Sequence, residues 1–233
     1  MRLPVTPVVL VPGLLCSSEI FAAQIPRLWP LGPVSIASTL EGERIEDAAQ
    51  SILSNAPPRF ALAGISMGGY LSLEIMRQAP SRVVKLALID TSARADTTAQ
   101  TRARMQSLAD ARTHFMGVAL LSLASLLHPR RRGDPDIIDI LQRMARTVGL
   151  EGYERQLGIA ISRPDSRPFL SAIDIPTLVL VRDGDPLTPV AHSQEIASAI
   201  RLATLKVLPD CGHLAPIEQP EYVADALAEW LRS

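Results

Sequence analysis

The sequence of 233 residues has few cysteines and few aromatic residues, and it carries almost no net charge. Its two cysteines, Cys16 and Cys211, are too few for a disulfide scaffold, and no further ligands stand in register for a structural zinc site. With 4% aromatic residues and a formal net charge of -1, the chain lacks a base-stacking surface and a field that would attract nucleic acid or an anionic membrane. We therefore expect a small-molecule substrate, no metal or cofactor, and two reduced thiols.

Long hydrophobic runs are also missing. The run GVALLSLASLL at 117–127 is about half the length that a bilayer requires. Pro4, Pro7 and Pro12 interrupt any helical signal segment at the N-terminus, and Leu15 before Cys16 is larger than the small residues of a cleavage site. The sequence therefore predicts a soluble, cytoplasmic protein, and it leaves the oligomeric state open.

Short apolar runs alternate with amphipathic stretches along most of the chain. Several runs are apolar on consecutive residues, which is typical of strands covered on both faces. The predicted strands are 5–11, 33–39, 59–65, 83–90, 176–181 and 203–208, and helices are predicted at 44–55, 67–78, 190–200 and 221–231. This alternation predicts an α/β protein with right-handed crossovers and a doubly wound, mostly parallel sheet.

Residues 93–172 depart from the alternation, because they contain no convincing strand. Four stretches have helical patterns: 97–115, 118–127, 136–148 and 153–162. A helical block between two strands of one sheet is an insertion, and we expect it over the edge where the strands end, since ligands bind there in such sheets. We call residues 93–172 the cap, and the predicted core is 1–92 with 173–233.

The stretch GISMGG at 64–69 has the spacing of a nucleophilic serine. Ser66 lies between Gly64 and Gly68, after an apolar strand and at the start of a helix, which is the context of the G-x-S-x-G turn. Glycine leaves room where the chain turns sharply, and a helix N-terminus favours developing negative charge. We expect Ser66 to be the nucleophile.

A serine nucleophile requires a base and an acid that orients the base. Of the four histidines, His213 alone lies in a loop after the last predicted strand and before the last helix, in PDCGHLAPIEQP. The acid is expected after a strand between the serine and the histidine, where VLVRDGDPLTP offers Asp183 and Asp185. One of these two carboxylates is a turn residue, and the pattern by itself leaves both candidates open.

The oxyanion of an acyl-transfer reaction requires two backbone N–H donors. Met67 follows the nucleophile and supplies the first. The second is expected from VVLVPGLLCSS after the first strand, where Gly13 lets the backbone approach and Pro12 cannot donate, so Leu14 is the predicted donor.

Taken together, these motifs resemble those of the α/β-hydrolase fold family over nearly the whole chain. GISMGG is similar to its nucleophile elbow, VLVPGLLCSS to its oxyanion loop, and CGHLAPIEQP to its histidine loop. The family's acid usually precedes an apolar-Thr-Pro stretch, which favours Asp185 over Asp183. Members often have glycine where this chain has Arg182, so Asp183 remains a minor rival. In the oxyanion loop many members have His-Gly where this chain has Pro12-Gly13.

The resemblance implies a serine hydrolase that cleaves a carboxylic ester, lactone or thioester of a small, largely apolar substrate. It also implies that the cap lines the pocket, for which Met116, Leu120 and Leu123 are candidates. Arginines are frequent in the cap, and because a guanidinium binds a carboxylate well, a single cap arginine facing Ser66 would favour a carboxylate-bearing substrate. Two alternatives remain: a non-hydrolytic lyase similar to the menaquinone-pathway synthase with the same triad, and a ligand receptor on the same fold. The loops that carry Cys16 and Cys211 both flank the expected site, so the two thiols could approach each other.

Overall fold

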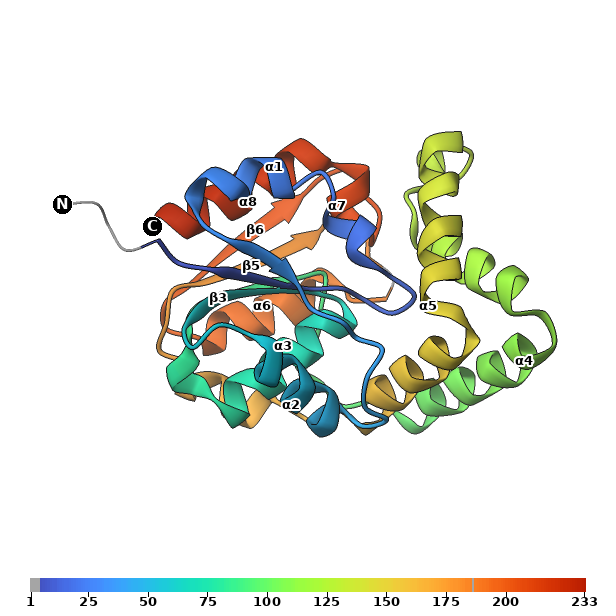
Figure 1. Cartoon of the computed structure of the whole chain (residues 1–233), viewed down its shortest axis with the longest axis horizontal. Helices are drawn as coiled ribbons and strands as arrows, with labels where there is room; N and C mark the ends of the chain where they lie inside the picture. The colour runs from blue at the N-terminus through green and yellow to red at the C-terminus, as the bar shows by residue number, and fades with distance from the viewer. Residues whose placement is uncertain (1–4, 186) are drawn as a thin grey trace.

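A computed structural model describes residues 5–185 and 187–233, and Pro4, one of the prolines expected to interrupt a signal helix, lies outside them. Six strands form one parallel sheet with the order β2-β1-β3-β4-β5-β6 (Figure 1). The strands are β1 Val8–Val11, β2 Val34–Ile36, β3 Phe60–Ile65, β4 Val83–Ile89, β5 Thr177–Arg182 and β6 Ala203–Leu208. The predicted parallel α/β sheet is therefore confirmed, with strand ends within a few residues of those expected.

Helices cover both faces of the sheet. Figure 1 shows α1 and α8 on one face and α2, α3 and α6 on the other. The α-helices are α1 Ile25–Leu28, α2 Ile45–Asn55, α3 Met67–Gln78, α4 Thr98–Leu126, α5 Pro135–Ser162, α6 Val190–Ala199, α7 Ala215–Glu218 and α8 Pro220–Arg232. Short 3-10 segments are η1 Ser18–Phe21, η2 Trp29–Leu31, η3 Pro80–Arg82, η4 Pro129–Arg131 and η5 Arg167–Ala172.

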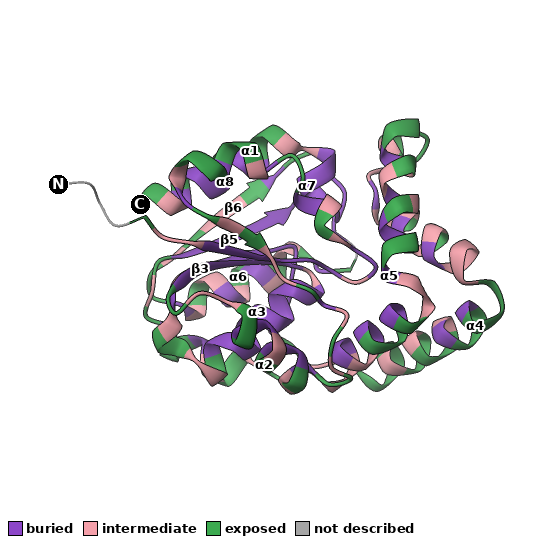
Figure 2. Cartoon of the chain, viewed as in Figure 1, coloured by how far each residue is buried: buried purple, intermediate pink, exposed green. Residues whose placement is uncertain are grey.

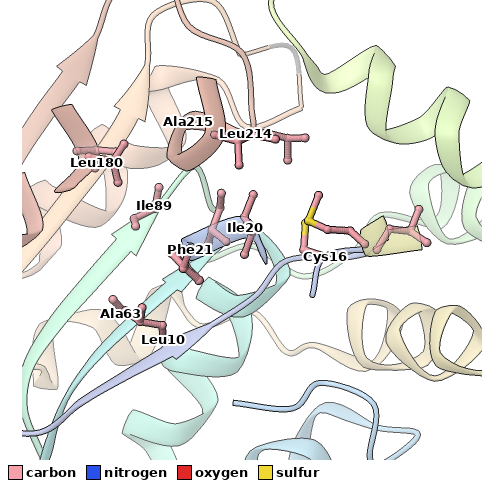
Figure 3. Close-up of a cluster of buried hydrophobic side chains, with 14 of the residues drawn as sticks. Leu10, Cys16, Ile20, Phe21, Ala63, Ile89, Leu180, Leu214 and Ala215 are labelled. Carbon is pink, nitrogen blue, oxygen red and sulfur yellow. The ribbon is translucent and has the colours of Figure 1, made fainter. Parts of the chain in front are cut away.

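The core has two layers because successive residues of a strand point to opposite faces. Leu10 belongs to the cluster under α1 and α8, whereas Val9 belongs to the cluster under α2, α3 and α6. Strands β3 and β5 are buried along their whole length (purple in Figure 2), which explains their continuous apolar sequences. Figure 3 shows side chains of the first cluster: Leu10, Ala63, Ile89 and Leu180 come from the strands, Ile20 and Phe21 from η1, and Leu214 and Ala215 from the loop before α7 and its first residue.

The residues between β4 and β5 form two long helices, α4 and α5, beside the edge where the strands end (Figure 1). Residues 93–172 are all described and contain no strand. The sequence predicted four helices here, and the structure has them as two pairs, each pair running on across a break in the helical backbone. The first two are joined as α4, with non-helical backbone angles at His114, and the last two as α5, interrupted by Gly149 at φ 66°. Glycine adopts this left-handed conformation without steric cost, so the polypeptide bends there.

In length and mean hydropathy the helices can be compared with what a membrane-spanning helix requires. Within the described ranges, none of the helices combines the length and the apolar character that crossing a bilayer requires.

Candidate active site

Ser66 lies on a strained turn between β3 and α3. Its backbone has φ 53° and ψ -115°, a conformation that a residue with a side chain rarely adopts. The Ser66 N–H donates to the Ile89 carbonyl at 2.9 Å, and the Thr91 hydroxyl donates to the Ser66 carbonyl at 2.8 Å. The neighbouring strand therefore holds the turn from both sides and fixes where the hydroxyl points.

The glycines around Ser66 are required by close backbone packing. A Cβ atom at Gly64 would collide with the carbonyl oxygen of Gly68, and one at Gly68 would collide with the carbonyl oxygen of Val11. Because backbone atoms cannot move aside as a flexible side chain can, neither position accepts a larger residue. The spacing of GISMGG thus reflects the contact of three segments: β1, β3 and the start of α3.

His213 lies in the loop between β6 and α7 and is buried. Its Nδ1 is 2.5 Å from Oδ2 of Asp185, and its backbone N–H donates to the Leu126 carbonyl at the end of α4, at 2.7 Å. Within the described residues, Nε2 of His213 is buried without a hydrogen-bond partner. The imidazole is therefore fixed through one nitrogen, and the other nitrogen is available.

Asp185 is buried and accepts several hydrogen bonds besides that of His213. The Thr188 N–H and hydroxyl donate to it at 3.0 and 2.6 Å, and the Arg182 guanidinium donates at 3.1 Å. Burial would raise the pKa of Asp185, but the hydrogen bond and charge interaction with His213 and the two bonds from Thr188 outweigh it and hold the pKa below its usual range. Asp183, by contrast, is exposed, so the structure brings Asp185 and not Asp183 to the histidine.

A second buried carboxylate, Asp90, follows β4. It has φ 43° and is fully buried, its Oδ1 accepts the Arg182 N–H at 3.1 Å, and its Oδ2 has no partner among the described residues. Burial, opposed by the charge of His213 and reinforced by that of Asp185, raises the pKa of Asp90 to about 7. Two acids of opposite protonation preference therefore lie close to the same imidazole.

Ser66 and His213 line one cavity of about 550 Å³, a volume that includes its opening to solvent. Leu14 and Met67, the predicted oxyanion donors, line it too. Among the hydrogen bonds of the described residues, none takes the N–H of either donor. The N–H of the next residue, Leu15, donates instead to Oε1 of a buried glutamine of α5, at 2.8 Å.

The cap contributes fewer of the expected pocket residues than the sequence predicted. Leu123 lines the cavity, whereas Met116 and Leu120 are not among the described residues that line it. Both pack, partly buried, against the apolar cluster that α4 shares with α5. An apolar stripe on a helix indicates burial but not which of several neighbours buries it, and here part of the stripe packs helix on helix.

The two cysteines are both buried and belong to the same apolar cluster. Cys16 and Cys211 are both free thiols, and Cys16 lines the cavity. Burial raises the pKa of Cys16 to about 12 and raises that of Cys211 as well. Neither thiol is therefore a ready nucleophile at neutral pH.

Four residues near the site were missed by sequence reasoning. Gln156 is fully buried in α5 and bonds both the oxyanion loop and the Thr39 hydroxyl, the latter at 2.9 Å. Asp90 lacks a motif that would separate it from turn residues, Thr188 was noted only as part of the apolar-Thr-Pro stretch and without a role, and Arg182 only as a departure from glycine. Gln156 could have been noticed only as a polar residue within an apolar stretch of α5, since a polar residue in such a stretch is often buried for a specific contact. In the described part of the chain, no cluster of three or more His, Cys, Asp or Glu side chains is arranged to hold a metal ion.

Comparison with known proteins agrees with this architecture. Residues 8–226 match the model of the alpha/beta hydrolase family. A thermophilic esterase from Thermogutta terrifontis, solved with malate bound, is 30% identical with a TM-score of 0.87, covering 97% of this chain and 89% of the esterase. The chain has no match among curated protein sequences.

Two further structures share the fold at lower identity. The enol-lactonase from Burkholderia xenovorans LB400 is 22% identical with a TM-score of 0.87, covering 98% of this chain and 92% of the lactonase. MenH from S. aureus is 19% identical with a TM-score of 0.79, covering 99% of this chain and 95% of MenH. The fold and the family match place this protein among the α/β proteins with a parallel sheet between two layers of helices. It belongs to the alpha/beta hydrolase family.

Proposed function

We propose that this protein is a serine hydrolase that cleaves a carboxylic ester, lactone or thioester of a small, largely apolar substrate. The observation that supports this best is that His213 lies in the wall of the cavity that Ser66 also lines, while its Nδ1 is 2.5 Å from Oδ2 of the buried Asp185 behind that wall. The esterase and lactonase with the same fold agree with this reaction class.

In the proposed first step, Oγ of Ser66 attacks the substrate carbonyl carbon and transfers its proton to Nε2 of His213. Nε2 is suited to this role because it is buried and has no partner among the described residues, while Asp185 holds the other nitrogen. The backbone N–H groups of Leu14 and Met67 stabilise the oxyanion that forms. Catalytic hydrogen bonds are often long in the absence of substrate, so the Ser66–His213 bond is expected to form on binding.

In the second step, the tetrahedral intermediate collapses and the carbon–oxygen or carbon–sulfur bond to the leaving group breaks. His213 gives its proton to the leaving group, and an acyl group remains on Ser66. Water then attacks the acyl-enzyme, His213 takes one of its protons, and the second collapse returns that proton to Ser66 and releases the acid. Because the buried carboxylate of Asp185 remains ionised, it stabilises the imidazolium in both steps.

The test is a panel of p-nitrophenyl esters, lactones and thioesters with wild type and Ser66→Ala. We expect the substitution to lower kcat by several powers of ten, since it removes the nucleophile. A fluorophosphonate should label wild type at the peptide that contains Ser66, as read by mass spectrometry. Ser125→Ala is the matched control, because Ser125 is exposed on α4 and is not among the described residues that line the cavity.

Equal rates for wild type and Ser66→Ala would show that the proposed nucleophile is wrong. The absence of ester turnover in a folded protein would instead favour a non-hydrolytic enzyme in which Ser66 acts as a base. Stabilisation by small ligands without any turnover would favour a receptor on this fold. The cavity contains one arginine and no described acid, and that basic character fits both the hydrolase and the lyase alternative.

A further inference from the structure

The cavity that contains Ser66 and His213 also exposes the side chain of Arg104, from the first half of α4. Arg104 is the one permanently charged side chain among the described residues that line this cavity. The remaining lining is largely apolar, with leucines from the oxyanion loop, the cap and both loops of the acid and the base: Leu14, Leu15, Leu123, Leu126, Leu187 and Leu214. The charge of the Arg104 guanidinium is poorly screened among these apolar side chains, so placing it there is costly unless it has a function.

The carboxylate next to Arg104 does not neutralise it. Asp96 accepts from Nε of Arg104 at 3.1 Å, but it also receives Nη1 of Arg163 at 2.7 Å and the Thr101 hydroxyl at 3.1 Å. Two guanidinium groups thus share one carboxylate, which leaves a net charge of +1 on this group of side chains.

The two arginines differ in how far their hydrogen-bond donors are used. Arg163 is buried, stacks over the Tyr70 ring at 4.3 Å, and donates to the Arg94 and Ala160 carbonyls as well as to Asp96. Arg104 donates only through Nε, and its Nη1 and Nη2 make no hydrogen bond within the described residues. The unused end of a guanidinium is the part that binds a carboxylate with two parallel hydrogen bonds.

We propose that Arg104 binds a carboxylate of the substrate, so that the ester, lactone or thioester cleaved at Ser66 carries a negatively charged carboxyl group elsewhere in the molecule. The statement that the bound molecule is cleaved at Ser66 rests on the proposed hydrolase function. The statement that Arg104 binds a carboxylate does not depend on it. Asp96 accepts a hydrogen bond from Nε of Arg104 and so orients its guanidinium. Arg163, which stacks on the Tyr70 ring, holds Asp96 in place through an ion pair. The rest of the substrate packs against the apolar walls of the cavity. Because Arg104 binds the carboxylate, the site prefers such a substrate to a neutral ester of the same size.

The first experiment measures binding alone. Isothermal titration compares adipate with adipamide, its uncharged isostere, in wild type, Arg104→Gln, Arg104→Lys and Arg102→Gln. Arg102 lies two residues away on the same helix and is exposed, so this variant makes the same change of charge outside the cavity. Circular dichroism of each variant confirms that it is folded, and Arg104→Lys retains the charge without the planar pair of donors.

We expect wild type and Arg102→Gln to bind adipate at least about tenfold more tightly than adipamide. Arg104→Gln should lose this preference, and Arg104→Lys should retain only part of it. Equal binding of adipate and adipamide by wild type would overturn the proposal, and so would an adipate preference that survives in Arg104→Gln.

The second experiment measures selectivity in turnover. It compares kcat/KM for mono-p-nitrophenyl adipate with that for p-nitrophenyl 5-carbamoylpentanoate, with Ser66→Ala as the blank for spontaneous hydrolysis. The ratio of the two values should fall by about tenfold to a hundredfold in Arg104→Gln and should be unchanged in Arg102→Gln. If neither ester is cleaved, the proposed hydrolase function fails, while the titrations still decide whether Arg104 binds carboxylates.

Discussion

Replacement of Asp90 by asparagine should make the protein more stable, and the gain should grow with pH. Asp90 is fully buried, and one carboxylate oxygen has no hydrogen-bond partner among the described residues. Asparagine retains the oxygen that accepts the Arg182 N–H, at 3.1 Å in the wild type, and removes the group that titrates.

The size and sign follow from the pKa of Asp90, which burial raises from its ordinary value of 3.8 to about 7. Below about pH 4 both the folded and the unfolded chain carry the proton, and the residue adds no pH dependence. Between about pH 4 and pH 7 the folded protein keeps a proton that the unfolded chain releases, so the wild type loses about 1.4 kcal/mol of stability per pH unit. Above that range the loss is constant at about 4 kcal/mol.

Urea unfolding of wild type and Asp90→Asn at pH 5, 6, 7 and 8 measures this directly. The free energy of unfolding of the variant minus that of wild type should increase by about 2 to 3 kcal/mol from pH 5 to pH 8. Any fixed cost of burying the amide would displace this curve without changing its slope. Asp183→Asn is the matched control, because Asp183 is exposed and should give a nearly flat difference. A flat difference for Asp90→Asn, or one that falls with pH, would refute the reasoning.

Three further substitutions or reagents test other parts of the structure. Asp185→Asn should lower kcat about a thousandfold or more, since the amide no longer fixes the imidazole tautomer, whereas Asp183→Asn should change it less than about twofold; esterase assays of both would decide which acid orients the base. Gly68→Ala should destabilise the protein by about 3 kcal/mol or more, because its Cβ would collide with the backbone of β1, and an unchanged urea midpoint would contradict that packing. Ellman's reagent at pH 8 should label Cys16 and Cys211 only after unfolding, since burial raises the pKa of both thiols, and rapid labelling of the native protein would be the contrary result.

The elements of the fold could be predicted closely, because their signals are local. Strand β3 and helix α3 follow from a continuous apolar run and a glycine elbow within 20 residues, and the structure gives Phe60–Ile65 and Met67–Gln78. The cap was less predictable. Its helices were recognised, but the joining of α4 across His114 was not, since helical propensity does not reveal whether a chain bends or breaks.

The site divides in the same way. Ser66 and His213 have sequence contexts that few other serines or histidines of this chain share, and both line one cavity in the structure. The choice of Asp185 over Asp183 could be expected from the family resemblance alone. The contact between Asp185 and His213 is known only from the structure. Arg104 could be predicted only as one of many cap arginines, because the sequence of a helix does not say which neighbour its polar face meets.

By itself the sequence determined the parallel sheet, the strained serine turn and the loops that carry the base and the acid, because apolar runs and glycine spacing act over a few residues. Only the tertiary structure decided which acid contacts the imidazole, that Asp90 is buried within range of the charge of His213, and that Arg104 lines the cavity while it shares Asp96 with Arg163. Those contacts join segments far apart in the chain, and their electrostatics depend on burial, which is a property of the packed molecule and not of any segment.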